Sequence, residues 1–342
     1  MKYQRRIPTM KKLLSIILAG VMAISLAACS TSPASSEEPA QVEKIDVNLG
    51  LLKGPTGMGA VELLDKNEKG EAANNYNFTL FSSPTDITAK VISGELDIAA
   101  VPSNLAATLY NKTEGGVKVV AVNTIGTLSI VEVGTRINDV KDLEGKTIYA
   151  AGQGATPEYA LDYVLTAAGI KDSVKIEWVP EHAEVVSMLA TGDATVGIIP
   201  EPNVTSVLLQ NADARVAIDM SKRWDEAAAS NGSDSRLVMG CIIVNSKFAE
   251  EHKDNLDAFL AEYAQSIDFV NGNVDEAARL CEHFEIIPKA PVAKKAIPNS
   301  GIVYLDGEEM EEALGAFLTV LNEYNPKIIG GKLPDEGFYY SK

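Results

Sequence analysis

The chain has 342 residues, of which 46% are hydrophobic, 6% aromatic and 23% charged, and its formal net charge at pH 7 is −17. So acidic a protein is a poor partner for nucleic acid or for anionic lipid headgroups, and we expect no nucleic-acid partner. A folded part of about 300 residues exceeds the size at which one hydrophobic core usually stays single, so two domains are expected.

The N-terminus has the layout of a cleaved export signal. Five basic residues precede an apolar run from Leu13 to Leu26, and the small residues Ala27 and Ala28 lead to Cys29. The apolar run is too short to span a bilayer, and no later segment has the composition of a membrane-spanning helix. We therefore predict that residues 1–28 are a signal peptide.

The ending Leu26-Ala27-Ala28-Cys29 resembles the lipobox of bacterial lipoproteins, in which the cysteine receives a diacylglyceryl group and becomes the first mature residue. Two or more acyl chains give stable anchoring, so a lipidated Cys29 would hold the protein at the outer face of the cytoplasmic membrane. The alternative is an ordinary secretory signal with a chance cysteine. Residues 29–44 then read as the lipidated cysteine and a polar, proline-containing tether with a reach of about 20 Å. The mature chain would carry a formal charge of −22, because five basic and no acidic residues precede Cys29.

The remaining cysteines and the histidines give little sign of metal or redox chemistry. Cys241 lies in an apolar run and Cys281 in a helical pattern, where they form either a disulfide or two isolated buried thiols. His182, His252 and His283 have no carboxylate or cysteine at ligand spacing. We expect no metal and no cofactor.

An internal repeat indicates the architecture. Residues 85–109 align with residues 183–208 as helix, glycine-acid turn, apolar strand, proline loop and helix, and in both copies the glycine precedes the proline by eight residues (Gly94 and Pro102, Gly192 and Pro200). Upstream, both copies begin with an apolar strand, a glycine-rich loop and a helix. Each half is therefore a β-α-β-α-β unit.

Short apolar strands that alternate with helices predict parallel sheets covered by helices. The strands are expected at 45–51, 77–81, 96–101 and 117–122 in the first half and at 147–151, 174–179, 195–199 and 215–219 in the second. Two more β-rich runs, at 128–133 and 237–245, follow the two halves where the chain would cross between lobes. The predicted fold class is α/β, with two doubly wound lobes, a hinge and a central ligand cleft. Lobe 1 is expected to comprise 45–124 plus 236–342, returning as helices beyond 246, and lobe 2 to comprise 125–235.

Ligand sites of such sheets lie beyond the carboxyl ends of the strands, so two facing lobes can share one cleft. The alternative is two independent doubly wound domains without a shared site, which the short connections near 125 and 235 disfavour.

Several motifs together resemble one protein family. They are the lipobox, Gly-Pro-Thr-Gly-Met-Gly at 54–59, Ser-Gly-Glu-Leu-Asp-Ile-Ala-Ala-Val-Pro at 93–102, Val-Lys-Asp-Leu-Glu-Gly-Lys-Thr-Ile at 140–148 and Gly-Asp-Ala-Thr-Val-Gly-Ile-Ile-Pro-Glu-Pro at 192–202. In this order and spacing they are similar to the nitrate, sulfonate, taurine and thiamine-precursor binding proteins of ABC importers, over 45 to about 325. The resemblance implies a type II periplasmic-binding fold, a membrane permease partner, a cytoplasmic ATPase reached through it, and a monomer. It does not fix the ligand.

Loops that end a strand and open a helix present unpaired backbone N–H groups and the positive end of the helix dipole. We expect the small-molecule ligand to contact such loops in both lobes, although capping and turn formation alone also explain these residue types. Thr85 is a plausible N-cap, Pro157 suits the start of a helix, and Met58 offers adaptable apolar contact. The candidate ligand-binding residues are Lys53, Gly54, Thr56, Gly57, Met58, Ser82, Ser83, Thr85, Pro102, Ser103, Asn104, Gly154, Ala155, Thr156, Glu201 and Asn203.

These loops carry few charges. Helix starts and hydroxyl groups favour an anion such as a carboxylate or sulfonate, yet only Lys53 is placed to neutralise one. Glu201 or Asp86 instead suits an amine or a protonated ring nitrogen, although Asp86 also reads as a solvated residue of a first helical turn. A zwitterion or a thiamine-precursor-like heterocycle fits as well as a simple anion.

Two other function classes compete with solute capture for import. An enzyme on the same fold needs a base beside a reactive group, but we expect the three histidines to lie in a loop and two helices, away from the strand-end loops. Neither a Gly-x-Ser-x-Gly elbow nor a phosphate-binding Gly-x-x-x-x-Gly-Lys loop occurs. A ligand-sensing receptor without transport would share the same closed form. We expect a non-enzymatic importer subunit.

Overall fold

The computed structural model of this protein describes residues 43–134 and 136–341. The predicted export signal, Cys29 and the tether as far as residue 42 lie outside these residues. Within them, no helix is both long enough and apolar enough to cross a membrane.

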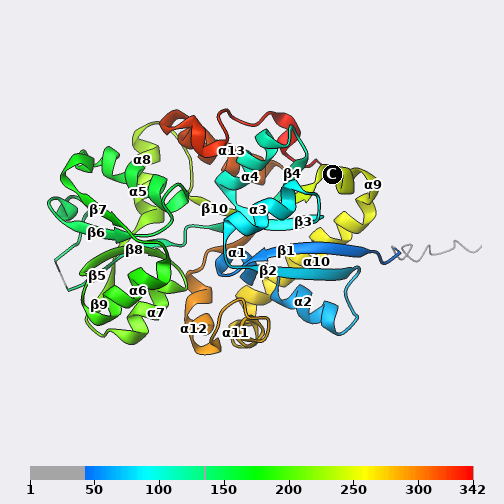
Figure 1. Ribbon diagram of the computed structural model, residues 1–342, viewed down its shortest axis with the longest axis horizontal. Helices are drawn as coiled ribbons and strands as arrows, with labels where there is room; N and C mark the ends of the chain where they lie inside the picture. The colour runs from blue at the N-terminus through cyan, green and yellow to red at the C-terminus, as the bar shows by residue number, and fades with distance from the viewer. Residues whose placement is uncertain (1–42, 135, 342) are drawn as a thin grey trace, which may run out of the picture. The chain divides into compact units, whose positions relative to one another are not determined.

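Two β-sheets organise the described residues (Figure 1). The first sheet contains β1 (Asp46–Leu52), β2 (Asn75–Phe81), β3 (Ile98–Pro102), β4 (Val117–Ile125), β10 (Val238–Asn245) and β11 (Ile302–Leu305). The second contains β5 (Leu128–Val133), β6 (Thr147–Ala150), β7 (Lys175–Trp178), β8 (Val196–Pro200) and β9 (Ala214–Asp219). The ten strands expected from the sequence are therefore present, with ends that differ by at most three residues.

The two sheets repeat one topology, as the internal repeat predicted. The strand order is β2-β1-β3-β10-β4 in the first sheet, with β11 added beyond β4, and β7-β6-β8-β5-β9 in the second. In both sheets the first strand of the repeat (β1 or β6) lies between the second (β2 or β7) and the third (β3 or β8). The strand that has just crossed from the other sheet (β10 or β5) lies between the third strand and the fourth (β4 or β9). We call each sheet, with the helices that contact it, the first and the second lobe.

The sheets are mixed, whereas the strand and helix pattern predicted parallel sheets and gave no direction for the two crossing strands. β10 pairs antiparallel with both β3 and β4, and β5 pairs antiparallel with β8 and β9. Each of these strands starts where the chain leaves the other lobe, at the edge where the parallel strands end, so it must run in the opposite direction. The prediction of only helices beyond 246 was also incomplete, because β11 pairs antiparallel with β4.

Thirteen α-helices accompany the sheets in the described residues. They are α1 (Pro55–Met58), α2 (Val61–Glu68), α3 (Pro84–Ile92), α4 (Ser103–Lys112), α5 (Thr156–Ala167), α6 (His182–Thr191), α7 (Asn203–Gln210), α8 (Met220–Ser230), α9 (Ser246–Glu251), α10 (Lys253–Gly272), α11 (Val274–His283), α12 (Ala290–Ala296) and α13 (Gly307–Tyr324). Short 3-10 helices lie at Val140–Leu143, Lys171–Ser173, Ile297–Asn299, Pro326–Ile329 and Glu336–Phe338.

Alternate residues of each strand point to opposite faces, so both faces of each sheet are buried under helices. In β3, Ile98 and Ala100 belong to the core under α2, α10 and α11, whereas Ala99 and Val101 belong to the core under α3, α4 and α13. In the second lobe α5 and α8 cover one face and α6 and α7 the other. The core under α3, α4 and α13 continues into the core under α5 and α8, so one hydrophobic cluster passes through both lobes.

The chain beyond α13 packs against the first lobe. The Asn111 side chain donates hydrogen bonds to the carbonyls of Ile329 and Lys332, both at 2.8 Å. Phe338 is fully buried, and its ring centroid lies 5.2 Å from that of Tyr110. The C-terminal segment therefore packs against α4 and stabilises its position.

Candidate functional site

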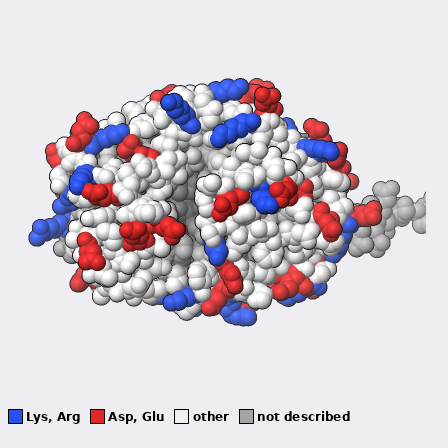
Figure 2. Space-filling model, viewed as in Figure 1, with Lys and Arg blue, Asp and Glu red and all other residues white. Residues whose placement is uncertain are grey.

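The carboxyl ends of the parallel strands in both lobes lie where the chain crosses between the sheets. Pro102, the last residue of β3, pairs with Gly240 near the start of β10, and Pro200, the last residue of β8, pairs with Leu128 at the start of β5. Residues 126 and 127 alone separate β4 from β5. Figure 2 shows a hollow between the two lobes, with acidic side chains beside it on both lobes. Open α/β sheets bind their ligands at such an edge, which makes this hollow the candidate site.

The first predicted loop begins at Gly54, whose φ of 98° is costly for any residue with a side chain. Its carbonyl accepts hydrogen bonds from the N–H groups of Gly57 and Met58 at 3.0 and 3.2 Å. Lys53 is exposed and Thr56 half-buried. Met58, in contrast, is fully buried in the core of the first lobe, so its side chain is a packing residue.

The second predicted loop lies at the start of α3. Ser83, rather than Thr85, is the N-cap, because its side chain accepts a hydrogen bond from the N–H of Thr85 at 3.1 Å. The expectation for Thr85 was wrong by two residues, since Pro84 takes the first helical position and shifts the helix start. Ser82, Thr85 and Asp86 are exposed. Asp86 occupies the first turn of α3, where the positive end of the helix dipole stabilises a carboxylate.

The third loop of the first lobe meets the first loop of the second. Asn104, in the first turn of α4, accepts a hydrogen bond at its Oδ1 from Oγ1 of Thr156 at 3.2 Å. Thr156 is the first residue of α5, and both side chains are buried. The repeat predicted that these helix starts face a common cleft, and the structure brings them into direct contact. Ser103, beside Asn104, is fully buried, and Pro102 is half-buried.

The glycine-rich loop before α5 is partly closed by its own helix. Gly154 is exposed with φ 79°, and its N–H donates to the Glu158 carboxylate at 2.6 Å. Ala155 is the N-cap and makes no side-chain cap hydrogen bond, and Pro157 follows at the second helical position. The N–H group of Gly154 therefore already has a hydrogen-bond partner, the Glu158 side chain of α5.

Glu201 is a buried carboxylate at the end of β8, with 5% of its surface exposed. Its backbone N–H donates to the carbonyl of Thr127 at 3.0 Å, which ties it to the crossing segment. Its Oε2 accepts a hydrogen bond from the N–H of Thr205 in the first turn of α7 at 3.1 Å. Burial raises the pKa of the Glu201 carboxyl to about 6, and the hydrogen bonds from Thr205 oppose that rise. Asn203, the first residue of α7, is half-buried.

The sequence interpretation missed a buried polar network beneath the first loop. The Asn123 side chain donates to the carbonyl of Thr56 and to the Tyr263 hydroxyl, both at 2.9 Å, and accepts from the Thr124 hydroxyl at 3.1 Å. A Cβ on Gly240 would lie 2.8 Å from Oδ1 of Asn123 and 3.1 Å from Cγ2 of Thr56. Two features of the sequence could have indicated this network: the Asn123-Thr124 pair near the end of an apolar strand, and Gly240 inside another apolar run.

The placement of the histidines was also misjudged at one position. His182 is the first residue of α6 and follows β7 by four residues, so it lies at the carboxyl edge of the second sheet. Its Nδ1 is buried and makes no hydrogen bond within the described residues, and burial lowers the pKa of the imidazole.

The two cysteines of the described chain are both free and buried. Burial raises the pKa of the Cys241 and Cys281 thiols, which makes both poor nucleophiles. Of the two arrangements left open by the sequence, isolated thiols are the correct one. In residues 43–134 and 136–341, no three His, Cys, Asp or Glu side chains gather closely enough to hold a metal ion.

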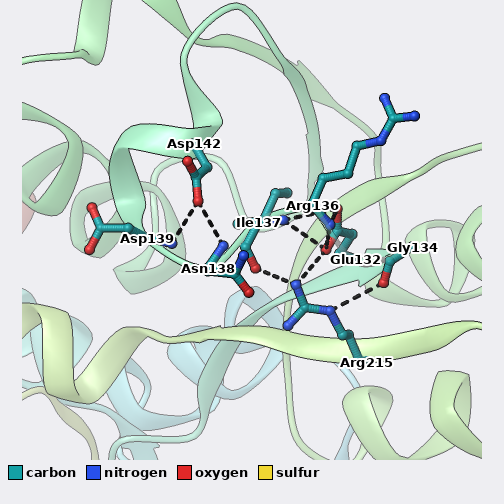
Figure 3. A network of polar contacts seen from close by, with 8 residues as sticks. All are labelled: Glu132, Gly134, Arg136, Ile137, Asn138, Asp139, Asp142 and Arg215. Atoms are coloured by element: carbon teal, nitrogen blue, oxygen red, sulfur yellow. Dashed lines mark hydrogen bonds and ion pairs between the residues drawn. The ribbon is translucent and has the colours of Figure 1, made fainter.

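A network of charged side chains lies away from the hollow. Glu132 accepts hydrogen bonds from the N–H groups of Arg136 and Ile137 and forms an ion pair with Arg215 at 2.8 Å (Figure 3). It occupies the end of β5 opposite Leu128, far along the strand from the crossing segment. We therefore assign this network to the stability of the second lobe.

Two lobes of repeated topology whose strand ends meet at one hollow define the type II periplasmic-binding fold. Residues 79–277, more than half of the chain, match the NMT1/THI5-like family. The chain therefore belongs to the NMT1/THI5-like family.

Solved structures agree with this fold. An ABC transporter protein from Parabacteroides distasonis is 23% identical, with a TM-score of 0.73 over 88% of this chain and 99% of that one. The periplasmic aliphatic sulphonate-binding protein SsuA from Escherichia coli is 16% identical, with a TM-score of 0.69 over 86% and 92%. The periplasmic nitrate-binding protein NrtA from Synechocystis PCC 6803 is 13% identical, with a TM-score of 0.54 over 78% and 75%. No curated protein sequence matches the chain.

Proposed function

We propose that this protein is the extracytoplasmic solute-binding subunit of an ABC importer, which captures a small polar organic solute between its lobes and delivers it to a membrane permease coupled to a cytoplasmic ATPase. The observation that carries the proposal is the meeting of strand-end loops from both lobes, with Asn104 and Thr156 in direct contact at 3.2 Å. Family membership and the similarity to sulphonate- and nitrate-binding proteins support it.

The lobes are assigned as 45–124 plus 236–342 and 125–235, joined at the two crossing segments. The ligand contacts are assigned to the strand-end loops, among them those that carry Gly54, Thr56, Gly154, Ala155 and Glu201. The solute is a sulfonate, a carboxylate or a thiamine-precursor-like heterocycle. Helix starts favour an anion, whereas a buried Glu201 carboxylate favours a group that donates hydrogen bonds or carries positive charge.

The protein binds its solute as a monomer and performs no chemistry on it. Residues 1–28 are removed on export and Cys29 carries the lipid anchor, which places the lobes on the outer side of the cytoplasmic membrane. A receptor that senses the same solute without transport is the alternative, and a permease and an ATPase encoded beside this chain distinguish the two.

A thermal-shift screen of the chain from Ser30 onward tests solute capture. The panel contains sulfonates, nitrate, amino acids, pyrimidines, thiamine and polyamines. A ligand at a hundred times its dissociation constant stabilises the fold by about 2.7 kcal/mol, which raises the melting temperature of a protein of this size by a few degrees. A saturable shift with one chemical class is expected, and the absence of any shift across the panel would count against solute capture.

The same screen with Glu201→Gln identifies the charge of the ligand group that lies beside Glu201. The variant should weaken a cationic or zwitterionic ligand far more than a simple anion, because only the former pairs with the carboxylate. Glu184→Gln is the matched control, since Glu184 is exposed in the first turn of the neighbouring helix α6. Equal losses for both ligand classes would remove Glu201 from the site.

A further inference from the structure

Helix α13 touches both lobes. It contacts β4, β10 and α4, which belong to the first lobe. Two of its side chains, Phe317 and Tyr324, reach residues of the second lobe. They lie about two turns apart on α13, so the helix meets the second lobe along one stripe.

Phe317 makes the apolar part of this contact. Its ring centroid lies 5.3 Å from that of Trp224 in α8, and the Trp224 ring lies 4.6 Å from that of Tyr163 in α5. Phe317 and Trp224 are both fully buried. Both side chains belong to the hydrophobic cluster that passes through the two lobes.

Tyr324 makes the polar part. Its hydroxyl donates to Oδ2 of Asp162 at 2.6 Å and accepts from Nζ of Lys171 at 2.5 Å, while Lys171 and Asp162 form an ion pair at 2.8 Å. Lys171 Nζ also lies 5.1 Å above the Tyr324 ring. Asp162 belongs to α5 and Lys171 to the turn that follows it, so one tyrosine of α13 joins two segments of the second lobe.

The lobes also meet where α12 of the first lobe contacts α7 of the second. The contact between the lobes at the cleft is of a different kind from that of α13. There Asn104 and Thr156 share a single neutral hydrogen bond at 3.2 Å. A single neutral hydrogen bond contributes little to stability, whereas a buried aromatic contact with a charge-assisted network has several contributions that must be lost together. The cleft contact therefore resists separation of the lobes less than the contact made by α13 does.

We propose that α13 is an interlobe anchor: Phe317 and Tyr324 keep it attached to the second lobe, so that the lobes open by rotation about the α13 side and the crossing segments. The anchor excludes widely separated arrangements of the lobes. It rests on the contacts of α13 alone and does not depend on the identity of any solute.

The consequence for binding rests on the proposed function. The apparent dissociation constant of a solute that needs the closed form equals the intrinsic constant divided by the closed fraction. An anchor that limits how far the lobes move apart raises the closed fraction in advance of binding, which is a form of preorganisation.

Interlobe distances measured without any solute test the anchor. Asp86→Cys in the first lobe and Glu181→Cys in the second are both exposed positions beside the strand-end loops, and nitroxide labels there report the distance across the cleft. The full chain carries Cys29→Ser in addition, and labelling is selective because Cys241 and Cys281 are buried. The double variant Tyr324→Phe/Lys171→Met removes the polar part of the anchor and keeps the aromatic ring.

We expect the double variant to broaden the distance distribution and to add longer distances, with a smaller shift in the same direction for Tyr324→Phe alone. Tyr304→Phe is the matched control, because the Tyr304 hydroxyl bonds to Asp306 within the first lobe, and its distribution should equal that of the unmodified protein. Distributions that stay unchanged in both anchor variants, or that broaden equally in Tyr304→Phe, would overturn the proposal. A failed solute screen would leave this result unaffected.

Discussion

At the residue scale, Glu201 is the group whose environment departs most from what its neighbours in sequence suggest. The sequence shows only that it stands between two prolines, whereas the burial of its carboxyl and the hydrogen bond from Thr205 depend on how α7 packs. The same loop in the first lobe carries Ser103 and Asn104, which are neutral. Equivalent loops of the two lobes therefore carry different groups, a carboxyl in the second lobe and neutral polar side chains in the first.

The raised pKa of Glu201 makes stability depend on pH in a defined direction. The carboxyl has an ordinary value of 4.5 and reaches about 6 in the folded protein, so between these values the folded state binds more protons than the unfolded state. The contribution of Glu201 to the free energy of unfolding therefore falls as pH rises through this window, by about 2 kcal/mol, and is constant above it. Urea unfolding of the unmodified chain and of Glu201→Gln at pH 5 and pH 7.5 checks this. The variant should lose less stability between the two pH values, and equal losses would contradict the assignment.

Glycine positions at the crossing show a second residue-scale effect. A Cβ on Gly301, which has φ 54°, would lie 1.6 Å from the carbonyl oxygen of Ile125. The N–H of Ile125 donates to the carbonyl of Gly301 at 2.9 Å, and the N–H of Gly126 donates to the carbonyl of Leu237 at the same distance. The segment between β4 and β5 is therefore held by backbone from two distant parts of the first lobe, in a space that excludes side chains.

At the element scale, the start of the second lobe depends on a buried ion pair. Glu132 in β5 has 5% of its surface exposed, and Arg215 in β9 binds its carboxylate, the carbonyl of Gly134 and the carbonyl of Ile137. The pair fastens two neighbouring strands to the turn between β5 and the 3-10 helix at Val140–Leu143 (Figure 3). Removing one partner of a buried pair leaves the other charge without compensation.

Arg215→Met should therefore destabilise the fold by about 2 to 3 kcal/mol, less than for a fully enclosed pair because the Arg215 side chain is partly exposed. Arg223→Met is the matched control, because Arg223 pairs with the exposed Glu226 and Asp139 and should cost about 0.5 kcal/mol or less. Chemical denaturation of the two variants measures the difference. Equal costs would show that Glu132 is held by the N–H groups of Arg136 and Ile137 alone.

At the scale of the whole molecule, attachment to the membrane is predicted from the sequence of residues 1–44. Cys29→Ser removes the only acceptor of the diacylglyceryl group, so the variant should move from the membrane fraction to the soluble fraction while keeping its solute-dependent thermal shift. Fractionation of cells with an immunoblot measures this. Retention of Cys29→Ser in the membrane fraction would favour an uncleaved N-terminal segment as the anchor, and release of the unmodified protein would favour an ordinary secretory signal.

The sequence by itself determined the strands, the helices and the repeated β-α-β-α-β unit, because strand and helix patterns depend on residues within a few positions of one another. It therefore predicted the ten strands, the strand-end loops and a cleft at the crossing. Only the tertiary structure decided the direction of β5 and β10, the contact of Asn104 with Thr156, the burial of Met58 and the network under Thr56. Each of these joins residues far apart in the chain, as Tyr324 and Asp162 do across 162 positions. Local patterns carry no information on which distant surfaces meet, since that is fixed by the packing of whole elements.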